Sequence, residues 1–203
     1  FPTRRSSDLA NENDEFIPVT AHGVKLLSMG LLINESDPVA VRGPLATRYV
    51  QQFLRNVAWG DVDFLILDLP PGTGDIQLTI VQTAELDGVV VVTTPQEVAL
   101  IDARKAIGLF ERVETPILGI IENMSYFQCP SDGKIYHIFG EGGGEREAAK
   151  LGVPLLGKIP LDISTRSGGD EGRPVALEDP GQNPVSAAFR QVAEQCARVV
   201  LDR

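Results

Sequence analysis

The sequence is poor in cysteine, in basic residues and in long apolar runs, and each shortage excludes a class of protein. Its two cysteines, Cys129 and Cys196, are too few for the disulfide framework of a small secreted domain. The 18 Lys and Arg are outnumbered by 28 Asp and Glu, and the net charge of -10 disfavours nucleic acid as a partner. No apolar run reaches the roughly 18 residues that a membrane helix needs. We therefore expect a cytoplasmic protein with no nucleic-acid or membrane partner.

The length of 203 residues and the hydrophobic content of 43% fit one domain with one core. The opening stretch, residues 1–10, has no initiator Met and no periodicity, and we interpret it as a foreign leader. Residues 11–203 are expected to form the carboxy-terminal portion of a single domain whose beginning has been lost.

Apolar runs of strand length alternate with segments in which apolar residues recur at helical spacing. Strands are predicted over Val24–Met29, Phe64–Leu67, Val89–Val92, Ile117–Ile121 and Pro154–Ile159. Helices are predicted over Pro44–Gly60, Ile76–Ala84, Glu97–Val113 and Glu145–Leu151, and from Pro184 onward. Cys196 belongs to the apolar stripe of the last helix, which indicates a structural thiol. The alternation predicts an α/β fold with a mostly parallel sheet flanked by helices.

The segment Asp68-Leu-Pro-Pro-Gly-Thr-Gly-Asp75 directly follows one of these predicted strands. Ligands of open parallel sheets bind beyond the carboxyl ends of the strands. The Asp68 carboxylate can hold a magnesium ion through water, and Gly72 and Gly74 let the main chain approach a terminal phosphate. Asp75 can cap the helix that follows. The alternative interpretation is a stiff turn without a ligand.

This octet and seven further motifs resemble the Mrp/ApbC family, relatives of the MinD and ParA ATPases, from about His22 to Leu177. The further motifs are Arg42-Gly-Pro44, Gln51-Gln-Phe53, Thr93-Thr-Pro-Gln96, Glu122-Asn-Met-Ser125, Ile138-Phe-Gly140, Gly142-Gly-Gly144 and Gly168-Gly-Asp-Glu-Gly-Arg-Pro174. The resemblance implies a deviant-Walker P-loop NTPase of the SIMIBI/MinD-like type, incomplete at the amino terminus. It further implies a homodimer that binds ATP and Mg²⁺ and delivers iron-sulfur clusters to apo-proteins.

By the same resemblance, Asp68 is the Walker B carboxylate and Gly72 and Thr73 belong to the nucleotide-binding loop, with Asp68 and Gly72 as catalytic candidates. Asn123 is implied to contact adenine. The residues themselves agree for Asn123, because it follows a predicted strand and its amide offers a donor and an acceptor to a base edge. The alternative is that Asn123 is a turn residue.

The Gly-Lys-Ser/Thr sequence of a phosphate-binding loop is absent from the chain. Gly152 to Lys158 matches the first seven positions of that motif, but Ile159 replaces the hydroxyl residue and the stretch has the character of an apolar strand. We expect that the motif was lost by truncation, that the complete protein hydrolyses ATP, and that this chain alone does not do so efficiently.

The family's Cys-x-x-Cys pair is broken here, because Cys129-Pro-Ser-Asp132 keeps only the first cysteine. In the family, two subunits that each give two thiolates could hold one four-iron cluster. With one cysteine per subunit, Asp132, His137 or an outside thiol would have to complete the ligand shell. Cys129 is therefore either a cluster ligand or an incidental thiol, and His137 is expected to be an ordinary loop residue.

Two other functions remain open: a MinD- or ParA-like positioning ATPase and a regulatory nucleotide-binding module without catalysis. A positioning ATPase is disfavoured because the chain lacks a basic amphipathic tail for a membrane and basic patches for DNA. A regulatory module is favoured by the absent phosphate loop and the broken cysteine pair. A Rossmann dehydrogenase is disfavoured, since no Gly-x-Gly-x-x-Gly follows a predicted strand. Gly140 to Gly144 is expected to begin a helix rather than to bind phosphate, and Arg42 and Arg173 receive no role.

Overall fold

The computed structural model describes residues 11, 15–32, 43–70, 72 and 74–202. The chain divides into two compact units, residues 1–85 and residues 86–203. Each unit is described by itself below. The proposed leader and Arg42 lie outside the described residues.

The first unit begins with a short antiparallel hairpin of β1 (Val19–Ala21) and β2 (Val24–Leu26), followed by α1 (Met29–Leu32). The turn falls on His22 and Gly23, whose φ angles are both positive at 52° and 80°. Two positive φ angles are what a tight two-residue hairpin turn requires. The predicted strand over residues 24–29 is shorter than expected, because β2 ends at Leu26 and α1 begins at Met29.

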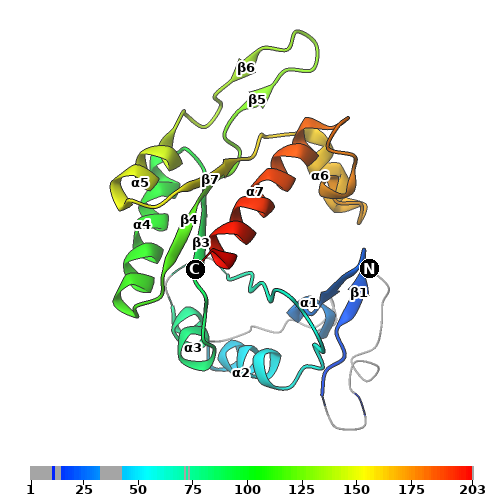
Figure 1. Ribbon diagram of the computed structural model, residues 1–203, viewed down its shortest axis with the longest axis vertical. Coiled ribbons are helices and arrows are strands. Elements are labelled where there is room, and N and C mark those ends of the chain that lie inside the picture. Colours follow the sequence, from blue (N-terminus) through cyan, green and yellow to red (C-terminus); the bar gives the residue numbers. More distant parts are fainter. Residues whose placement is uncertain (1–10, 12–14, 33–42, 71, 73, 203) are drawn as a thin grey trace. The chain divides into compact units, whose positions relative to one another are not determined.

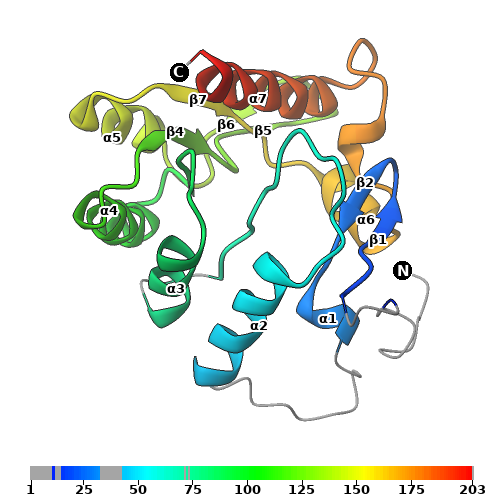
Figure 2. The ribbon, with the colours of Figure 1, turned by 60° about the horizontal axis from the view of Figure 1, so that its bottom comes forward.

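Two helices of the first unit, α2 (Gly43–Arg55) and α3 (Asp75–Thr83), lie side by side (Figure 2). The prediction that the first of them extends to Gly60 is wrong. Residues beyond Arg55 leave the helix because Val57 forms a parallel bridge with Phe16, and the Ala58 amide donates to the Phe16 carbonyl at 2.9 Å. Hydrogen bonds to a distant segment of the same chain therefore end the helix at Arg55, although apolar residues continue at helical spacing beyond it.

The predicted strand Phe64–Leu67 is also wrong, because these residues form no regular element. Phe64 and Leu65 are nearly half exposed and Ile66 is 86% exposed. An apolar run becomes a buried strand only where neighbouring strands accept its backbone hydrogen bonds. Among the described strands, none pairs with this run. Asp68 consequently follows an irregular segment and not the end of a strand.

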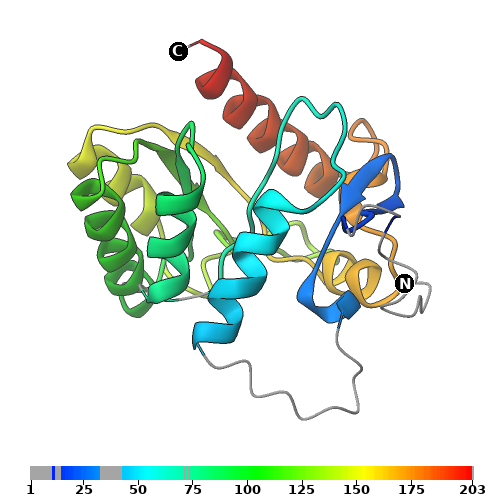
Figure 3. The same cartoon turned by 90° about the horizontal axis from the view of Figure 1, so that it is seen from below.

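The second unit contains a parallel sheet of β3 (Val89–Thr93), β4 (Ile117–Glu122) and β7 (Leu155–Lys158), in the order β3-β4-β7. All three strands were predicted to within two residues. Figures 1 and 3 show α4 (Glu97–Arg112) and α5 (Gly143–Leu151) on one face of the sheet and α7 (Pro184–Leu201) on the other. The predicted parallel sheet flanked by helices is confirmed.

The core of the second unit forms where α4 and α5 meet the sheet. Its centre consists of Val91, Ile107, Ile120 and Ala148. Ile120 on the middle strand is fully buried, as expected for a strand covered on both faces. Continuous burial of this kind is what makes such strands recognisable as unbroken apolar runs.

The remaining elements of the second unit surround the carboxyl end of the sheet. A hairpin of β5 (Phe127–Gln128) and β6 (Ile135–Tyr136) stands out from the unit between β4 and α5 (Figure 1). Helix α6 (Ile163–Asp170) and a 3-10 turn, η2 (Val175–Leu177), connect β7 to α7. No helix in the described part of the chain is both long enough and apolar enough to span a membrane.

Candidate functional site

The Asp68 to Asp75 segment of the first unit is a loop that leads into α3. Asp68 is exposed, and Gly72 adopts a φ of +108° with open space around the position of a Cβ. A backbone of that geometry suits glycine and leaves the main chain accessible. The expected cap is wrong by one residue, because Gly74 is the N-cap and Asp75 is the first helical residue. Thr73 lies outside the described residues.

Gln77 attaches this loop to α3, and sequence reasoning did not identify it. Its side chain is 4% exposed, and its Nε2 donates to the Pro70 carbonyl at 2.9 Å. A buried amide at the third position of a helix is an unusual choice unless it has a partner. Gln77 therefore fixes the start of the loop that contains Asp68 and Gly72.

The second unit places Asn123 at the carboxyl end of its middle strand, as predicted. The ladder between β4 and β7 continues past this point, since the Ile159 amide donates to the Glu122 carbonyl and the Ser125 amide donates to the Ile159 carbonyl, both at 2.9 Å. Asn123 and Met124 are therefore looped out of a continuous ladder. Met124 has a φ of +52°, which is uncommon for a residue with a side chain.

The orientation of the Asn123 amide is set by its own turn. The Met124 backbone amide donates to Asn123 Oδ1 at 3.0 Å, and the Asn123 amide donates to the Thr93 carbonyl at 2.7 Å. Since a backbone N–H needs an acceptor, the oxygen must face Met124 and Nδ2 must face away. Within the described residues Nδ2 has no hydrogen-bond partner, so it is a donor available to a ligand.

Asn123 and Met124 line a cavity of about 420 Å³ in the second unit. A volume of that order is typical of small-molecule sites. The cavity walls are mainly apolar and include Phe189 and Val192 of α7. Its polar lining residues are Asn123, Asp162, Thr165 and Arg166. A mainly apolar cavity with a few polar lining groups has the character of a small-molecule site.

Asp162 is the acid among these polar lining residues, and it also caps α6. Burial alone would raise the pKa of the Asp162 carboxyl, but hydrogen bonds from Ser164 Oγ and from the Thr165 amide at 3.0 Å lower it. The carboxylate is thus held ionised in the cavity wall. Sequence reasoning missed Asp162, although an acidic residue followed by Ser and Thr is a capping signal.

The glycine-rich segment before α5 packs closely and does not form an open phosphate loop. A Cβ on Gly143 would lie 2.5 Å from the Pro95 carbonyl oxygen. The Gly144 amide already donates to Glu122 Oε2 at 2.7 Å, so a carboxylate of the chain itself occupies the helix N-terminus. The interpretation of this segment as the beginning of a helix is confirmed, since α5 starts at Gly143.

Cys129 lies at the end of β5, in the turn of the protruding hairpin. Its Sγ is 3.1 Å from Ser131 Oγ, and hydrogen bonds from that hydroxyl and from the Ser131 and Asp132 amides lower the pKa of the Cys129 thiol. A lowered pKa favours the thiolate, which is the form that binds metals. Cys129 is half-buried and forms no disulfide.

The residues expected to complete a cluster site beside Cys129 already have partners in the same chain, and the Asp132 side chain is also hydrogen-bonded to the Cys129 thiol. Asp132 accepts from the Lys134 amide at 3.1 Å and pairs with the Lys134 ammonium at 3.2 Å. His137 Nε2 lies 3.6 Å from Glu141 Oε1. Over the described ranges, no three His, Cys, Asp or Glu side chains gather into a metal site. One chain by itself therefore offers a single soft ligand here.

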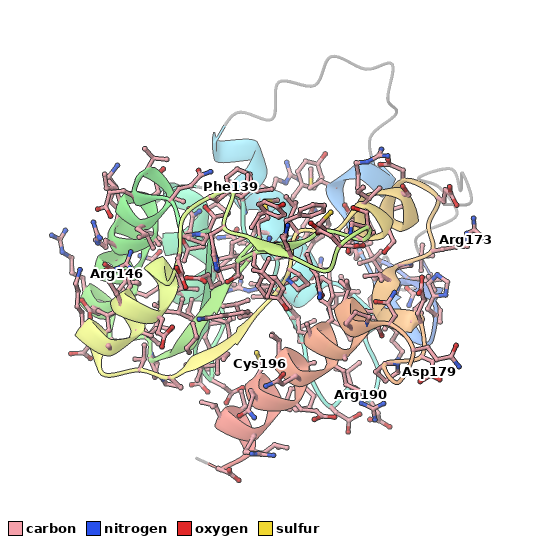
Figure 4. The ribbon with its side chains drawn as sticks, turned by 90° about the horizontal axis from the view of Figure 1, so that it is seen from above. Phe139, Arg146, Arg173, Asp179, Arg190 and Cys196 are labelled. Carbon is pink, nitrogen blue, oxygen red and sulfur yellow. The ribbon has the colours of Figure 1, made fainter. Side chains whose placement is uncertain are left out.

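Three further expectations concern residues away from this site. The motif-like stretch from Gly152 to Lys158 is a helix C-cap followed by β7, as its apolar character predicted. Figure 4 shows Arg173 extending away from its unit, where it pairs with Glu171. Cys196 is half-buried on α7, and burial raises the pKa of its thiol, consistent with a structural residue.

The predicted site residues are divided between the two units. Asp68 and Gly72 belong to the first unit, while Asn123 and Cys129 belong to the second. Within the second unit the structure brings Asn123 and Asp162 to one cavity. The hairpin with Cys129 begins at Phe127, only four residues after Asn123.

Comparisons with known proteins agree with these features. A sequence model of the ParA group, described as NUBPL iron-transfer P-loop NTPase, matches residues 3–197. The iron-sulfur cluster carrier protein of Pyrococcus furiosus is 48% identical over 172 residues, which cover 85% of this chain and 58% of that protein. The iron-sulfur protein required for NADH dehydrogenase, mitochondrial, of Arabidopsis thaliana is 46% identical over 188 residues, which cover 93% of this chain and 60% of that protein.

Solved structures give the same fold. A nucleotide-binding protein from Archaeoglobus fulgidus in complex with ADP matches with a TM-score of 0.66 and 38% identity, over 78% of this chain and 62% of that one. The septum site-determining protein MinD with Mg-ADP from Pyrococcus horikoshii matches with a TM-score of 0.54 and 26% identity, over 73% and 56% of the two chains. The predicted P-loop NTPase fold is confirmed. The chain spans less than two thirds of the length of each of these four proteins.

Proposed function

Because the chain belongs to the family of NUBPL iron-transfer P-loop NTPases, we propose that the complete protein is an ATP-dependent iron-sulfur cluster carrier. It binds ATP with Mg²⁺, holds a cluster between two subunits, and delivers the cluster to apo-proteins. The observation that carries the proposal is the family match over residues 3–197, to which relatives named as cluster carriers add 48% identity.

Nucleotide binding is supported by the cavity at the carboxyl end of the sheet. We propose that adenine enters it and that Asn123 Nδ2 donates to a ring nitrogen of the base. The apolar walls, which include Phe189, would shield the faces of the ring from water. The structure of the Archaeoglobus fulgidus relative, which contains ADP, supports a nucleotide as the ligand.

Phosphate and metal contacts are proposed for the loop of the first unit. Gly72 and Thr73 would lie beside the terminal phosphate, and Asp68 would hold Mg²⁺ through water, since a hard cation prefers carboxylate oxygen. The exposed Asp68 carboxylate and the open backbone at Gly72 suit these roles. Mg²⁺ would neutralise charge that develops on the transferred phosphoryl group. Asp68 and Gly72 are thus the catalytic candidates.

The cluster is cargo, and Cys129 is its proposed ligand. A four-iron cluster is commonly held by four thiolates, whereas two copies of this chain bring only two through Cys129. We propose a homodimer whose cluster is bound incompletely and released easily. A thiol of the apo-protein can then complete the shell during transfer. Sparse cysteine fits a reducing compartment, and we propose the cytoplasm.

ATP hydrolysis is proposed for the complete protein, since these 203 residues contain no Gly-Lys-Ser/Thr sequence. The test uses the full-length gene product. Isothermal titration with ATP and Mg²⁺ should give one site per subunit, and Asp68→Ala should abolish hydrolysis while leaving most of the binding. Anaerobic reconstitution with iron and sulfide, followed by reactivation of an apo form of a four-iron enzyme, tests delivery. Binding without hydrolysis or transfer would instead support a regulatory nucleotide-binding module.

A further inference from the structure

Glu122 is a fully buried carboxylate at the last position of β4, directly before Asn123. A buried carboxylate is costly unless hydrogen bonds satisfy its oxygens. Both oxygens of Glu122 are satisfied: Oε1 accepts from Ser125 Oγ at 2.5 Å and Oε2 accepts from the Gly144 amide at 2.7 Å. Neither of these two partners is a cation.

The two partners of Glu122 bracket the segment that contains Cys129. Ser125 stands two residues before β5, and Gly144 lies in the first turn of α5, so residues 125–144, which include the protruding hairpin, begin and end at hydrogen-bond partners of one carboxylate. The hairpin itself lies between β4 and α5 along the chain (Figure 1). The root of the hairpin is also fixed to the loop after β7, because the Leu161 amide donates to the Tyr126 carbonyl at 2.7 Å. A single side chain thus joins both ends of the hairpin segment.

The same carboxylate stabilises the turn that presents Asn123. The looped-out pair Asn123 and Met124 lies between Glu122 and Ser125, whose side chains are hydrogen-bonded to each other across it. Met124 adopts a left-handed φ of +52°, a conformation that persists only when its surroundings enforce it. The Glu122 to Ser125 bond is one such constraint, and the ladder bond from the Ser125 amide to the Ile159 carbonyl is another.

We propose that Glu122 is a positioning residue whose carboxylate holds in one arrangement the turn that presents Asn123 to the base and the two ends, Ser125 and Gly144, of the segment that contains the Cys129 hairpin. The inference rests on the proposed binding of ATP at Asn123. The contact between Asn123 and the base and the position of the hairpin then both depend on the Glu122 carboxylate. Removing a hydrogen bond of the Glu122 carboxylate should change both the affinity for nucleotide and the accessibility of Cys129.

The test uses the full-length gene product with Ser125→Ala, Glu122→Ala and Glu122→Gln. The matched control is Ser186→Ala, since Ser186 is equally buried in the same unit, bonds the Glu178 carbonyl at 2.7 Å, and does not line the cavity. Affinities for ATP and for inorganic tripolyphosphate are measured by competition with a ribose-labelled fluorescent ATP analogue. The rate of Cys129 alkylation is followed by mass spectrometry.

We expect Ser125→Ala and Glu122→Ala to weaken ATP binding by about tenfold, the equivalent of one good hydrogen bond. Tripolyphosphate, which has no base, should bind as before, and Cys129 should be alkylated faster. Glu122→Gln should restore both properties, because its amide can donate to Ser125 Oγ and accept from the Gly144 amide. A purely structural role would lower the melting temperature of Ser125→Ala and Ser186→Ala alike without separating the two ligands.

The ratio of the affinity for ATP to the affinity for tripolyphosphate is compared between Ser125→Ala and Ser186→Ala. Equal ratios in the two variants would overturn the proposal. This comparison does not need Glu122→Ala, so it can be made even if that variant does not fold. An unchanged Cys129 rate in a variant that has lost ATP affinity would overturn the part that concerns the hairpin. If the unmutated protein does not bind ATP, the proposed function itself is refuted. That result is distinguishable from a failure of the Glu122 proposal, in which the unmutated protein binds ATP and the variants behave alike.

Discussion

Arg104 of α4 holds Glu147 of α5 through two parallel hydrogen bonds, from Nε to Oε2 at 2.9 Å and from Nη2 to Oε1 at 2.7 Å. Glu147 is 5% exposed, whereas Arg104 is partly open to solvent and also contacts Glu97. Lys150 adds a further contact to Glu147 at 2.8 Å. This two-point contact joins the two helices that cover one face of the sheet.

The Arg104 and Glu147 pair predicts a stability change in acid. Hydrogen bonds from Arg104 and Lys150 lower the pKa of the Glu147 carboxyl from 4.5 to about 2. A lowered folded pKa stabilises the protein above the unfolded pKa, and this stabilisation is lost as the pH falls from about 4.5 toward 2. Glu147→Gln should lower the free energy of unfolding at pH 7 by about 2 kcal/mol and flatten its dependence on pH in that window.

Urea unfolding at pH 7, 4 and 3 measures the effect of Glu147→Gln. Glu97→Gln is the matched control, because Glu97 contacts the same guanidinium from an exposed position and should change stability little. Equal losses in the two variants would show that burial of Glu147 is not what makes its contact strong.

Gly143 and Gly108 provide a contrast within one unit. A Cβ on Gly143 would lie 2.5 Å from the Pro95 carbonyl oxygen, while one on Gly108 in α4 would meet nothing within 4 Å. Gly143→Ala should destabilise the protein by about 2 kcal/mol through overpacking. Gly108→Ala should stabilise it by about 0.5 to 1 kcal/mol, since alanine loses less backbone entropy in a helix. Thermal unfolding by circular dichroism checks both signs, and a neutral Gly143→Ala would show that the Pro95 loop can move aside.

Parts of this structure were predictable because the signal is local. The strands around Val91 and Ile120 are unbroken apolar runs whose central residues are buried, so their composition alone indicates them. The last helix begins at Pro184, as the proline and the apolar stripe together predicted. The β5–β6 hairpin was missed, although Asp132-Gly133 in its turn is a hairpin signal, because strands of two residues show no alternation.

Other parts depend on partners far along the chain. Phe64–Leu67 has the composition of a buried strand, but composition does not supply the neighbouring backbone that a strand needs. Glu122 was seen only as one letter of a motif, since its second partner, Gly144, lies 22 residues away. The feature of the sequence that could have identified Glu122 is a carboxylate at the end of an apolar strand. Such a carboxylate must be either exposed to solvent or hydrogen-bonded through both oxygens.

Asn123→Asp should weaken ATP binding by the full-length protein by about tenfold or more, because it replaces the free Nδ2 donor with a second oxygen. The oxygen that accepts from the Met124 amide is retained, so the turn itself should persist. Gln191→Glu is the matched control, since it makes the same change from amide to carboxylate at an exposed position of α7. Isothermal titration decides: an equal loss in both variants would mean that added negative charge, and not the lost donor, weakens binding.

Asp132→Cys should raise the amount of cluster that the full-length protein holds after anaerobic reconstitution with iron and sulfide. It gives each subunit two thiols in the turn of the hairpin, and two subunits then offer four thiolates to one cluster. Cys129→Ala should remove the cluster absorbance, because it deletes the one cysteine of the hairpin, whose lowered pKa favours the thiolate. Cys196→Ala is the control, since Cys196 is half-buried on α7 and its raised pKa disfavours the thiolate. The visible charge-transfer absorbance and the iron content per subunit measure the result. If Cys129→Ala and the unmutated protein show the same absence of absorbance, and Asp132→Cys adds none, then this hairpin does not carry the cluster.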